Sequence, residues 1–316
     1  MKPLVLVTEG SDPEPLAWLK SRVEVVELPV DSPDLRPRLA EVQGLVVRTY
    51  TIVTDALLAR LPKLKVVARG GVGLDNIDVS ACRRRGVEVV YTPAANTLAV
   101  ADFVFGLMLA LLRPVRSFGP EVADPAAFKR YRAELRARQL NEMTLGILGM
   151  GRIGHRVGRI AANGFGMRVL YNDLVDRSGS VDFAATAVSK ETLYAESDVV
   201  TLHVDLRAGN EGLVGTEALA AMKRDALLIN TCRGEVLDAF ALADALSRGR
   251  LAGAAVDVFA EEPPPPTHPL LGAPRVILTP HIAARTETGL TNMSWVVRDV
   301  VEVLEGRPPT YPAPHD

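Results

Sequence analysis

The sequence predicts an α/β protein with two Rossmann-like domains, each built on a doubly wound parallel sheet, and a cleft between them. Three observations support this prediction: short apolar runs alternate with helical patterns, the alternation starts twice, and a glycine-rich turn opens the second series. Alternating strands and helices are typical of parallel sheets, because each parallel connection needs a crossover. The chain has 316 residues, enough for two domains with separate cores.

The first series covers residues 1–96. Its strand candidates are the apolar runs LVLV, VEVV, GLVV, KVVA and a second VEVV, separated by helical segments such as TDALLARLP. A long apolar helix from about Thr97 to Arg113 follows and ends at Pro114, because proline cannot continue a helix. We expect the first series to form a flavodoxin-like substrate domain.

The second series begins after residue 142. Its strand candidates are, in chain order, TLGIL, MRVLYND, DVVTLHV, ALLINTC, LAGAAVDV and RVILTP. A final helical pattern, from about Glu287 to Leu304, follows the last of these strands, so we expect it to return to the first domain. The predicted domains are therefore residues 1–96 plus 285–316, and residues 97–284.

Composition argues against several classes of protein. The chain is 48% hydrophobic and 23% charged, with a formal net charge of −2, so it lacks the basic excess of a nucleic-acid-binding protein. The most apolar stretch, Phe103 to Leu112, is too short to cross a membrane. The two cysteines have no metal-ligand spacing, so we predict no metal site and expect a reducing compartment, the cytoplasm.

A dinucleotide-binding fingerprint follows the first strand of the second series. The run Gly149-Met150-Gly151-Arg152-Ile153-Gly154 comes directly after TLGIL and opens a helical pattern. In such a turn the first glycine allows the tight bend, and the second lets a pyrophosphate approach the backbone. The third lets helix and strand pack closely. The pyrophosphate then lies at the helix N-terminus.

Asp173 ends the next predicted strand and is placed to bind the adenosine ribose. A carboxylate there accepts hydrogen bonds from the ribose hydroxyls and repels a 2′-phosphate, so the sequence favours NAD over NADP. Arg177 lies close in sequence but does not replace the carboxylate. The structural alternative for Asp173 is a turn residue at a strand end.

Three polar residues follow other strands of this series: Arg233 after ALLINTC, Glu262 after LAGAAVDV, and His281 after RVILTP. The carboxyl ends of strands in an open α/β sheet line the ligand crevice, so we expect a guanidinium, a carboxylate and an imidazole to meet there. These groups suit holding a substrate carboxylate and moving a proton beside it. Together with the dinucleotide fingerprint, they predict hydride transfer on a small acid.

With these residues in place, the sequence resembles the D-isomer-specific 2-hydroxyacid dehydrogenases, most closely their phosphoglycerate dehydrogenase branch. The resemblance is carried, in order, by VVRTYTIVTDALL, ARGGVGLDNIDV, AANTLAVAD, GILGMGRIGHRVG, NTCRGEVLD, DVFAEEP and LTPHIAART. It implies that Arg233 binds the substrate carboxylate and carbonyl, that His281 is the acid/base, and that Glu262 pairs with it. Glu262, rather than Glu261, falls at the family's interval of five residues after Asp257.

The resemblance also implies further binding residues. The backbone of Gly71, Val72 and Gly73 would hold the substrate carboxylate, with Asn96 nearby. The implied cofactor contacts outside the fingerprint are His203, Thr231, Cys232 and Asp257, the last at the nicotinamide end.

The sequence departs from the family pattern at three positions. Asp205 and Arg207, in HVDLRAGNEGL, stand where the family usually has Pro and Thr. Asp102 stands where Glu is usual. None of the three carries the chemistry itself.

Three arginines suggest a substrate with a second anionic group. Arg48 follows GLVV, Arg69 precedes the Gly71 loop, and Arg132 lies in segment 115–142, which in the family forms an arm that packs on the partner subunit. Guanidinium groups match the oxygens of phosphate and phosphonate. We therefore expect a homodimer that acts on an acid such as 3-phosphoglycerate, 3-phosphohydroxypyruvate or phosphonopyruvate.

Two alternatives stay open. One is a general 2-oxo acid reductase of the glyoxylate/hydroxypyruvate type, which needs no second anionic group on its substrate. The other belongs to a different class, an NAD-sensing, corepressor-like binding protein on the same fold, which can retain the same three polar residues. Formate oxidation is disfavoured, because those relatives pair the histidine with a glutamine.

Overall fold

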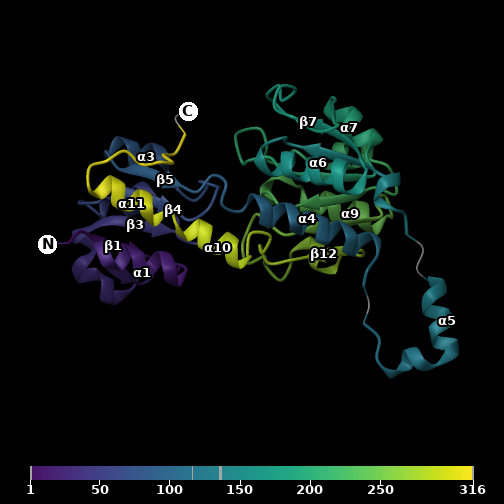
Figure 1. Cartoon of the computed structure of the whole chain (residues 1–316), viewed down its shortest axis with the longest axis horizontal. Coiled ribbons are helices and arrows are strands. Elements are labelled where there is room, and N and C mark those ends of the chain that lie inside the picture. Colours follow the sequence, from purple (N-terminus) through teal and green to yellow (C-terminus); the bar gives the residue numbers. More distant parts are fainter. Residues whose placement is uncertain (1, 116, 135–136, 315–316) are drawn as a thin grey trace. The chain divides into compact units, whose positions relative to one another are not determined.

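The structure is a computed structural model that describes residues 2–115, 117–134 and 137–314 (Figure 1). It divides into two compact units, one of residues 1–96 and 284–316 and one of residues 97–283. Each unit is built on a single parallel sheet with interleaved helices. This arrangement confirms the α/β, Rossmann-like fold class predicted from the sequence.

The first unit has a five-stranded sheet in the order β2-β1-β3-β4-β5, the strand order of flavodoxin-like folds. The strands are β1 (Leu4–Val7), β2 (Glu24–Glu27), β3 (Val42–Val47), β4 (Val66–Arg69) and β5 (Glu88–Tyr91). The helices are α1 (Pro13–Arg22), the 3₁₀ helix η1 (Pro33–Glu41), α2 (Asp55–Ala59), α3 (Val79–Arg84), α10 (Glu287–Ser294) and α11 (Val297–Leu304).

One face of this sheet is completed by the C-terminal part of the chain. Val297 and Val300 of α11 are fully buried in a cluster with Val5 and other valines of the strands. Gly44 permits the close approach of the helix, because a Cβ at that position would lie 3.2 Å from Val300 Cγ1. In Figure 1, the yellow α11 accordingly lies over the purple and blue strands.

The final helical pattern forms two helices where the sequence predicted one. The break falls at Trp295 and Val296, where the Val296 N–H bonds to the Met293 carbonyl three residues back. This i→i+3 bond replaces the usual i→i+4 bond and tightens the turn. The apolar periodicity continues through the break, which is why the sequence pattern does not reveal it.

The second unit has a seven-stranded sheet in the order β12-β11-β10-β9-β6-β7-β8. The strands are β6 (Thr144–Leu148), β7 (Arg168–Asn172), β8 (Thr186–Ala187), β9 (Val199–Leu202), β10 (Leu227–Asn230), β11 (Gly253–Val256) and β12 (Val276–Leu278). The helices are α4 (Thr97–Leu112), α5 (Pro125–Glu134), α6 (Arg152–Phe165), α7 (Lys190–Glu196), α8 (Thr216–Ala221) and α9 (Ala239–Ser247). Short 3₁₀ helices are η2 (Pro120–Ala123), η3 (Leu140–Glu142), η4 (Gly234–Val236) and η5 (Pro269–Gly272).

The order of strands reverses at β6, which lies between β7 and β9. In open α/β sheets such a switch point is where ligands bind. The glycine fingerprint directly follows β6, so it opens at this point. Strand β8 has only two residues, both exposed, and therefore carries no apolar run by which the sequence could predict it.

The apolar stretch in the middle of the chain is a helix of the core. Val104, Leu107 and Met108 of α4 are buried, and the helix packs against α6, β10 and β11. Within the described ranges, no helix is long and apolar enough to cross a membrane.

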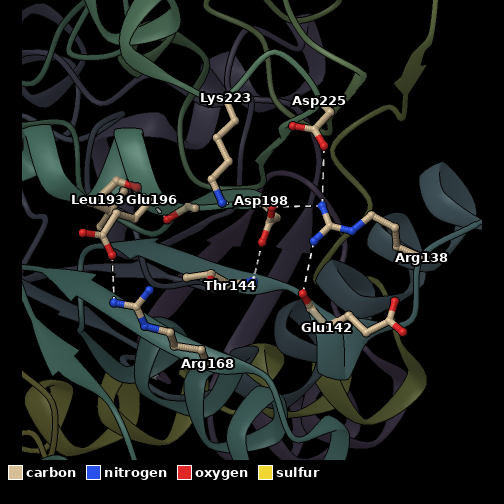
Figure 2. A network of polar contacts seen from close by, with 10 residues as sticks. Arg138, Glu142, Thr144, Arg168, Leu193, Glu196, Asp198, Lys223 and Asp225 are labelled. Atoms are coloured by element: carbon tan, nitrogen blue, oxygen red, sulfur yellow. Dashed lines mark hydrogen bonds and ion pairs between the residues drawn. The ribbon is translucent and has the colours of Figure 1, made fainter.

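A buried carboxylate, Asp198, ties together the starts of neighbouring strands (Figure 2). It lies just before β9, and its oxygens accept hydrogen bonds from Thr144 N (2.7 Å), Arg138 Nη1 (2.9 Å) and Lys223 Nζ (3.1 Å). Arg138 also donates to the Glu142 carbonyl at 3.1 Å. Burial alone would raise the pKa of Asp198, but these hydrogen bonds outweigh it and lower the pKa. The network fixes where the chain enters β6.

Replacing Asp198 by Asn should lower the free energy of unfolding by about 2 kcal/mol, because the buried site loses the charge that its two cationic partners face. The folded-state pKa of Asp198 lies below its unfolded value, so this stabilisation is present above the unfolded pKa and is lost as the pH falls through the folded pKa. Urea unfolding across the acidic range should therefore show a steeper loss of stability in the wild type than in Asp198→Asn.

The matched control is Glu196→Gln. Glu196 accepts from Arg168 at 2.8 Å in the same region (Figure 2), but both side chains are exposed. Its loss should change the free energy of unfolding by less than about 0.5 kcal/mol. Equal losses in the two variants would contradict a special role for Asp198.

Candidate active site

The glycine fingerprint is shaped by close backbone contacts. Gly149 has a left-handed φ of 95°, and a Cβ there would lie 2.5 Å from the His203 carbonyl oxygen. A Cβ on Gly154 would lie 2.0 Å from the Gly149 oxygen, whereas one on Gly151 would meet nothing within 4 Å. Side chains are therefore excluded at the first and third glycines by the protein itself. The open space at the second, where α6 begins, fits an approaching pyrophosphate.

Asp173 lies beside this turn, at the end of β7. Its Oδ2 accepts from Met150 N at 2.8 Å and faces Arg177 Nε at 3.4 Å, while Oδ1 accepts from Val175 N at 2.9 Å. The side chain is 12% exposed. The carboxylate is thus held against the fingerprint, which fits the predicted contact with the adenosine ribose.

The loops after β9 and β10 hold the other predicted cofactor residues. Burial lowers the pKa of His203 to about 3, so its ring, which contacts Thr201 Oγ1 at 2.9 Å, stays neutral and suits a cofactor neighbour better than a proton donor. Thr231 Oγ1 is buried and has no hydrogen-bond partner among the described residues. Burial raises the pKa of the Cys232 thiol to about 11, so Cys232 is no nucleophile. The unsatisfied Thr231 hydroxyl fits a ligand group.

Arg233 is positioned by a steric constraint on its neighbour. A Cβ on Gly234 would lie 2.0 Å from the Phe259 carbonyl carbon and 2.2 Å from Ala260 N. Only glycine lets the loop after β10 pack this closely on the loop after β11. Arg233 Nη1 donates to the Cys232 carbonyl at 2.6 Å. The contact brings the Arg233 loop against the segment that leads to Glu262.

Glu262 and His281 form a direct pair, as the sequence predicted. His281 Nδ1 lies 2.8 Å from Glu262 Oε2 and 3.1 Å from Oε1. Burial would raise the pKa of Glu262, but hydrogen bonds from His281 and Phe259 N, together with the charges of His281 and Arg233, lower it below its ordinary value. The carboxylate is therefore ionised at neutral pH and oriented toward the imidazole. Glu261 does not make this contact.

Asp257 holds the loop that carries His281. Its carboxylate is fully buried and accepts from Thr279 Oγ1 (2.6 Å), Ile282 N (2.9 Å) and Ala283 N (2.9 Å). The His281 N–H bonds to the Asp257 carbonyl at 2.8 Å. The contact of Asp257 with the nicotinamide, implied by the family resemblance, stays a prediction. Its role in holding the histidine loop is not indicated by the sequence pattern.

The predicted substrate residues of the first unit lie at strand ends. Arg48 follows β3, and its Nη2 lies 3.9 Å from Met293 Sδ. Arg69 ends β4 and donates to the Gly70 carbonyl at 3.0 Å, and its guanidinium covers Gly71, where a Cβ would lie 2.7 Å from Nη1. The Val72 and Gly73 backbone continues this loop. Asn96 Oδ1 is buried without a hydrogen-bond partner among the described residues.

A further arginine, Arg285, lies close enough to Arg48 to affect its pKa, and the sequence patterns did not single it out. The pKa of Arg48 is lowered first by burial and then by the charge of Arg285, while the charges of Glu9 and Asp12 act in the opposite direction. Arg285 lies in the motif LTPHIAART, four residues after His281. Its position shortly after strand β12 is the sequence feature that could have indicated a binding role. Arg132, in contrast, is exposed in the last turn of α5, which belongs to the other unit.

Comparison with known proteins shows what the chain is similar to. Residues 105–283 match the family model described as D-isomer specific 2-hydroxyacid dehydrogenase, NAD binding domain. The chain is 37% identical over 309 residues to a glyoxylate reductase of Korarchaeum cryptofilum. This match covers 95% of the chain and 92% of that protein.

Two more relatives extend the comparison. A D-3-phosphoglycerate dehydrogenase of Archaeoglobus fulgidus is 33% identical over 308 residues, but the match spans 96% of this chain and only 58% of that protein. The crystal structure of a D-lactate dehydrogenase from Aquifex aeolicus, complexed with NAD and lactic acid, is 30% identical with a TM-score of 0.82 and 96% of each chain covered.

The variant Gly234→Ala tests the contact that positions Arg233. Its methyl group would force apart two backbone segments, so we expect the free energy of unfolding to fall by about 2 kcal/mol, as measured by urea unfolding. Gly272→Ala is the control, because a Cβ there has open space; its effect should stay within about 0.5 kcal/mol. Similar effects at both glycines would refute the steric argument.

Proposed function

Because the chain belongs to the D-isomer-specific 2-hydroxyacid dehydrogenase family, we propose that it is an NAD-dependent dehydrogenase that interconverts a small D-2-hydroxy acid and its 2-oxo acid. The observation that carries this proposal is the Glu262–His281 pair at 2.8 Å, next to the loop of Arg233. Both cysteines are free and buried, which suits the cytoplasm that we propose as its location.

The three side chains divide the work in the reduction direction. NAD(H), when bound, supplies the hydride. Arg233 binds the substrate carboxylate and polarises the carbonyl, and this positioning accounts for much of the expected rate enhancement. His281 uses Nδ1 to contact Glu262, which leaves Nε2 to give a proton to the carbonyl oxygen. Glu262 stabilises the protonated imidazole and orients the ring. In oxidation, neutral His281 takes the proton back.

The variant His281→Ala should lower kcat by roughly two to four orders of magnitude with little change in NADH binding, because it removes the proton donor. Glu262→Gln should lower kcat by about tenfold or more, since the imidazole loses the carboxylate that orients its ring. Stopped-flow turnover and NADH fluorescence titration measure the two effects.

Glu261→Gln is the matched control for the second variant and should leave kcat unchanged. A fall in kcat in Glu261→Gln and not in Glu262→Gln would assign the partner role to Glu261 and contradict the proposal. A wild type that oxidises NADH with none of a panel of 2-oxo acids would favour the NAD-sensing binding protein instead.

We further propose that the substrate carries a second anionic group, a phosphate or phosphonate. The supporting observation is a set of three arginines in the first unit: Arg69 covers Gly71, and the charge of Arg285 acts on Arg48. The charges of Glu9 and Asp12 offset part of that effect on the pKa of Arg48. Guanidinium groups match phosphate oxygens. The relatives include both phosphoglycerate dehydrogenases and glyoxylate reductases, so a general 2-oxo acid reductase is the competing function.

The variants Arg48→Ala and Arg285→Ala should each lower kcat/KM for 3-phosphohydroxypyruvate or phosphonopyruvate by about tenfold or more relative to glyoxylate, because each removes one charge facing the second anion. Arg60→Ala is the control, since Arg60 pairs with exposed Asp31 at 3.0 Å. If the wild type uses glyoxylate equally well, or the variants slow all acids alike, the general reductase is the better description.

We propose a homodimer joined through segment 115–142, of which Arg116, Leu135 and Arg136 lie outside the described residues. The support is apolar exposure: Val115 is 100% exposed, Phe128 49%, and Phe118 and Val122 37% each. Several exposed apolar side chains within one short segment favour burial against a partner. Arg132 of α5 would then be available to a partner subunit's substrate.

Light scattering should give a dimer mass at micromolar concentration, and Phe128→Asp should shift the protein toward monomer, because a charge cannot be buried at an apolar contact without cost. Phe240→Asp is the control: Phe240 is 75% exposed on α9, outside this segment. A wild-type monomer, or equal dissociation in both variants, would contradict the proposal.

A further inference from the structure

Two residues that depart from the family pattern, Asp205 and Arg207, lie in the loop after β9, next to the nucleotide fingerprint. The His203 N–H bonds to the Leu148 carbonyl at 2.8 Å, at the end of β6. A Cβ on Gly149 would lie 2.5 Å from the His203 oxygen and 3.0 Å from Val204 Cγ1. The loop therefore leaves the sheet in contact with the first glycine of the fingerprint.

The Asp205 carboxylate binds one edge of the Arg207 guanidinium with both of its oxygens. Arg207 Nε donates to Asp205 Oδ1 at 2.7 Å, and Arg207 Nη2 donates to Oδ2. Asn210, which is 8% exposed, donates from Nδ2 to the Asp205 carbonyl at 2.9 Å and to Oδ1 at 3.3 Å. Asp205 thus forms a bidentate pair with the guanidinium and is also bonded by Asn210, while the side chains of Arg207 and Asp205 stay 56% and 57% exposed.

The loop of this pair borders the turn of the fingerprint to which Asp173 is also bonded, because Gly149 contacts His203 and Val204 and the Met150 N–H donates to Asp173 at 2.8 Å. The pKa of Arg207 is raised first by its hydrogen bonds to Asp205, and the charge of Asp173 also contributes. Asp173 in turn faces Arg177 at 3.4 Å. Two segments that border the fingerprint turn therefore each carry an arginine paired with a carboxylate, Arg177 with Asp173 and Arg207 with Asp205.

We propose that Asp205 is a second cofactor-selecting residue, which acts with Asp173 by keeping Arg207 from a 2′-phosphate. A free guanidinium beside the ribose would form a charge-assisted pair with that phosphate and admit NADP(H). Paired with Asp205, the same guanidinium is neutralised and already bonded. The chain thus carries Arg207, whose guanidinium could bind the 2′-phosphate of NADP(H), together with Asp205, which occupies that guanidinium.

The experiment compares adenosine 2′,5′-bisphosphate with 5′-AMP by calorimetric titration of the intact protein, because the two probes differ only in the 2′-phosphate. Asp205→Asn should improve the affinity for the bisphosphate relative to AMP by about tenfold, as expected for the release of one charge pair. The double variant Asp205→Asn/Arg207→Ala should lose this gain.

Two controls separate charge from loop shape. Asn210→Ala disturbs the loop without changing its charge and should leave the affinity ratio as in the wild type. Asp244→Asn removes the partner of Arg248 in an exposed pair of 2.8 Å on α9 and should also leave the ratio unchanged.

The proposal is overturned if Asp205→Asn leaves the ratio unchanged or weakens both nucleotides equally, since Asp205 would then only shape the loop. It is also overturned if the gain survives removal of Arg207, because the gain would then come from lost repulsion alone. These measurements require only nucleotide binding. An unchanged affinity ratio would therefore not contradict the proposed dehydrogenase activity, and a lack of turnover would not contradict the role of Asp205 in cofactor choice.

Discussion

The fully buried carboxylate of Asp257 determines the position of His281, the residue that we propose as the acid/base. It binds one hydroxyl and two backbone N–H groups of the loop after β12, and its own backbone carbonyl takes the His281 N–H. His281 has a left-handed φ of 52°, a conformation that non-glycine residues adopt only where their surroundings impose it. The Asp257 bonds impose it, and the ring then meets Glu262. A carboxylate buried behind the loop thus sets the geometry of the group that we propose as the proton donor.

Carboxylates bind the backbone of other segments in the same way at several further places in the chain. Among the carboxylates that accept backbone N–H groups of distant segments are Glu9 for residues 48, 50 and 51, Asp198 for residue 144, Asp257 for residues 282 and 283, and Asp299 for residues 310 and 311. Buried N–H groups need partners, and an ionised acceptor gives stronger bonds than a neutral one. Two of these acids shape candidate site segments: Glu9 fixes the turn that follows Arg48, and Asp257 fixes the histidine loop.

The sequence predicts those parts of the fold and site that depend on local patterns. Apolar runs locate the strands, and the spacing of glycines locates the nucleotide turn, because both reflect repeating or short-range constraints. Strand β8 has two exposed residues, and the break between α10 and α11 is made by one backbone bond, so neither leaves a pattern. The loop-holding role of Asp257 and the neighbourhood of Arg48 and Arg285 arise from contacts between segments far apart in the chain, which periodicity does not encode.

The burial of α11 against the first sheet bears on how the protein folds. Val5 and Val300 share one core cluster although almost the whole chain separates them, and the second unit is inserted between them as a continuous segment, residues 97–283. During synthesis the second unit can therefore close its core while the first still exposes an apolar sheet face. Contacts of such high sequence separation form late and slowly. An incomplete chain would thus expose a strip of valines, the surface that chaperones bind and that promotes aggregation.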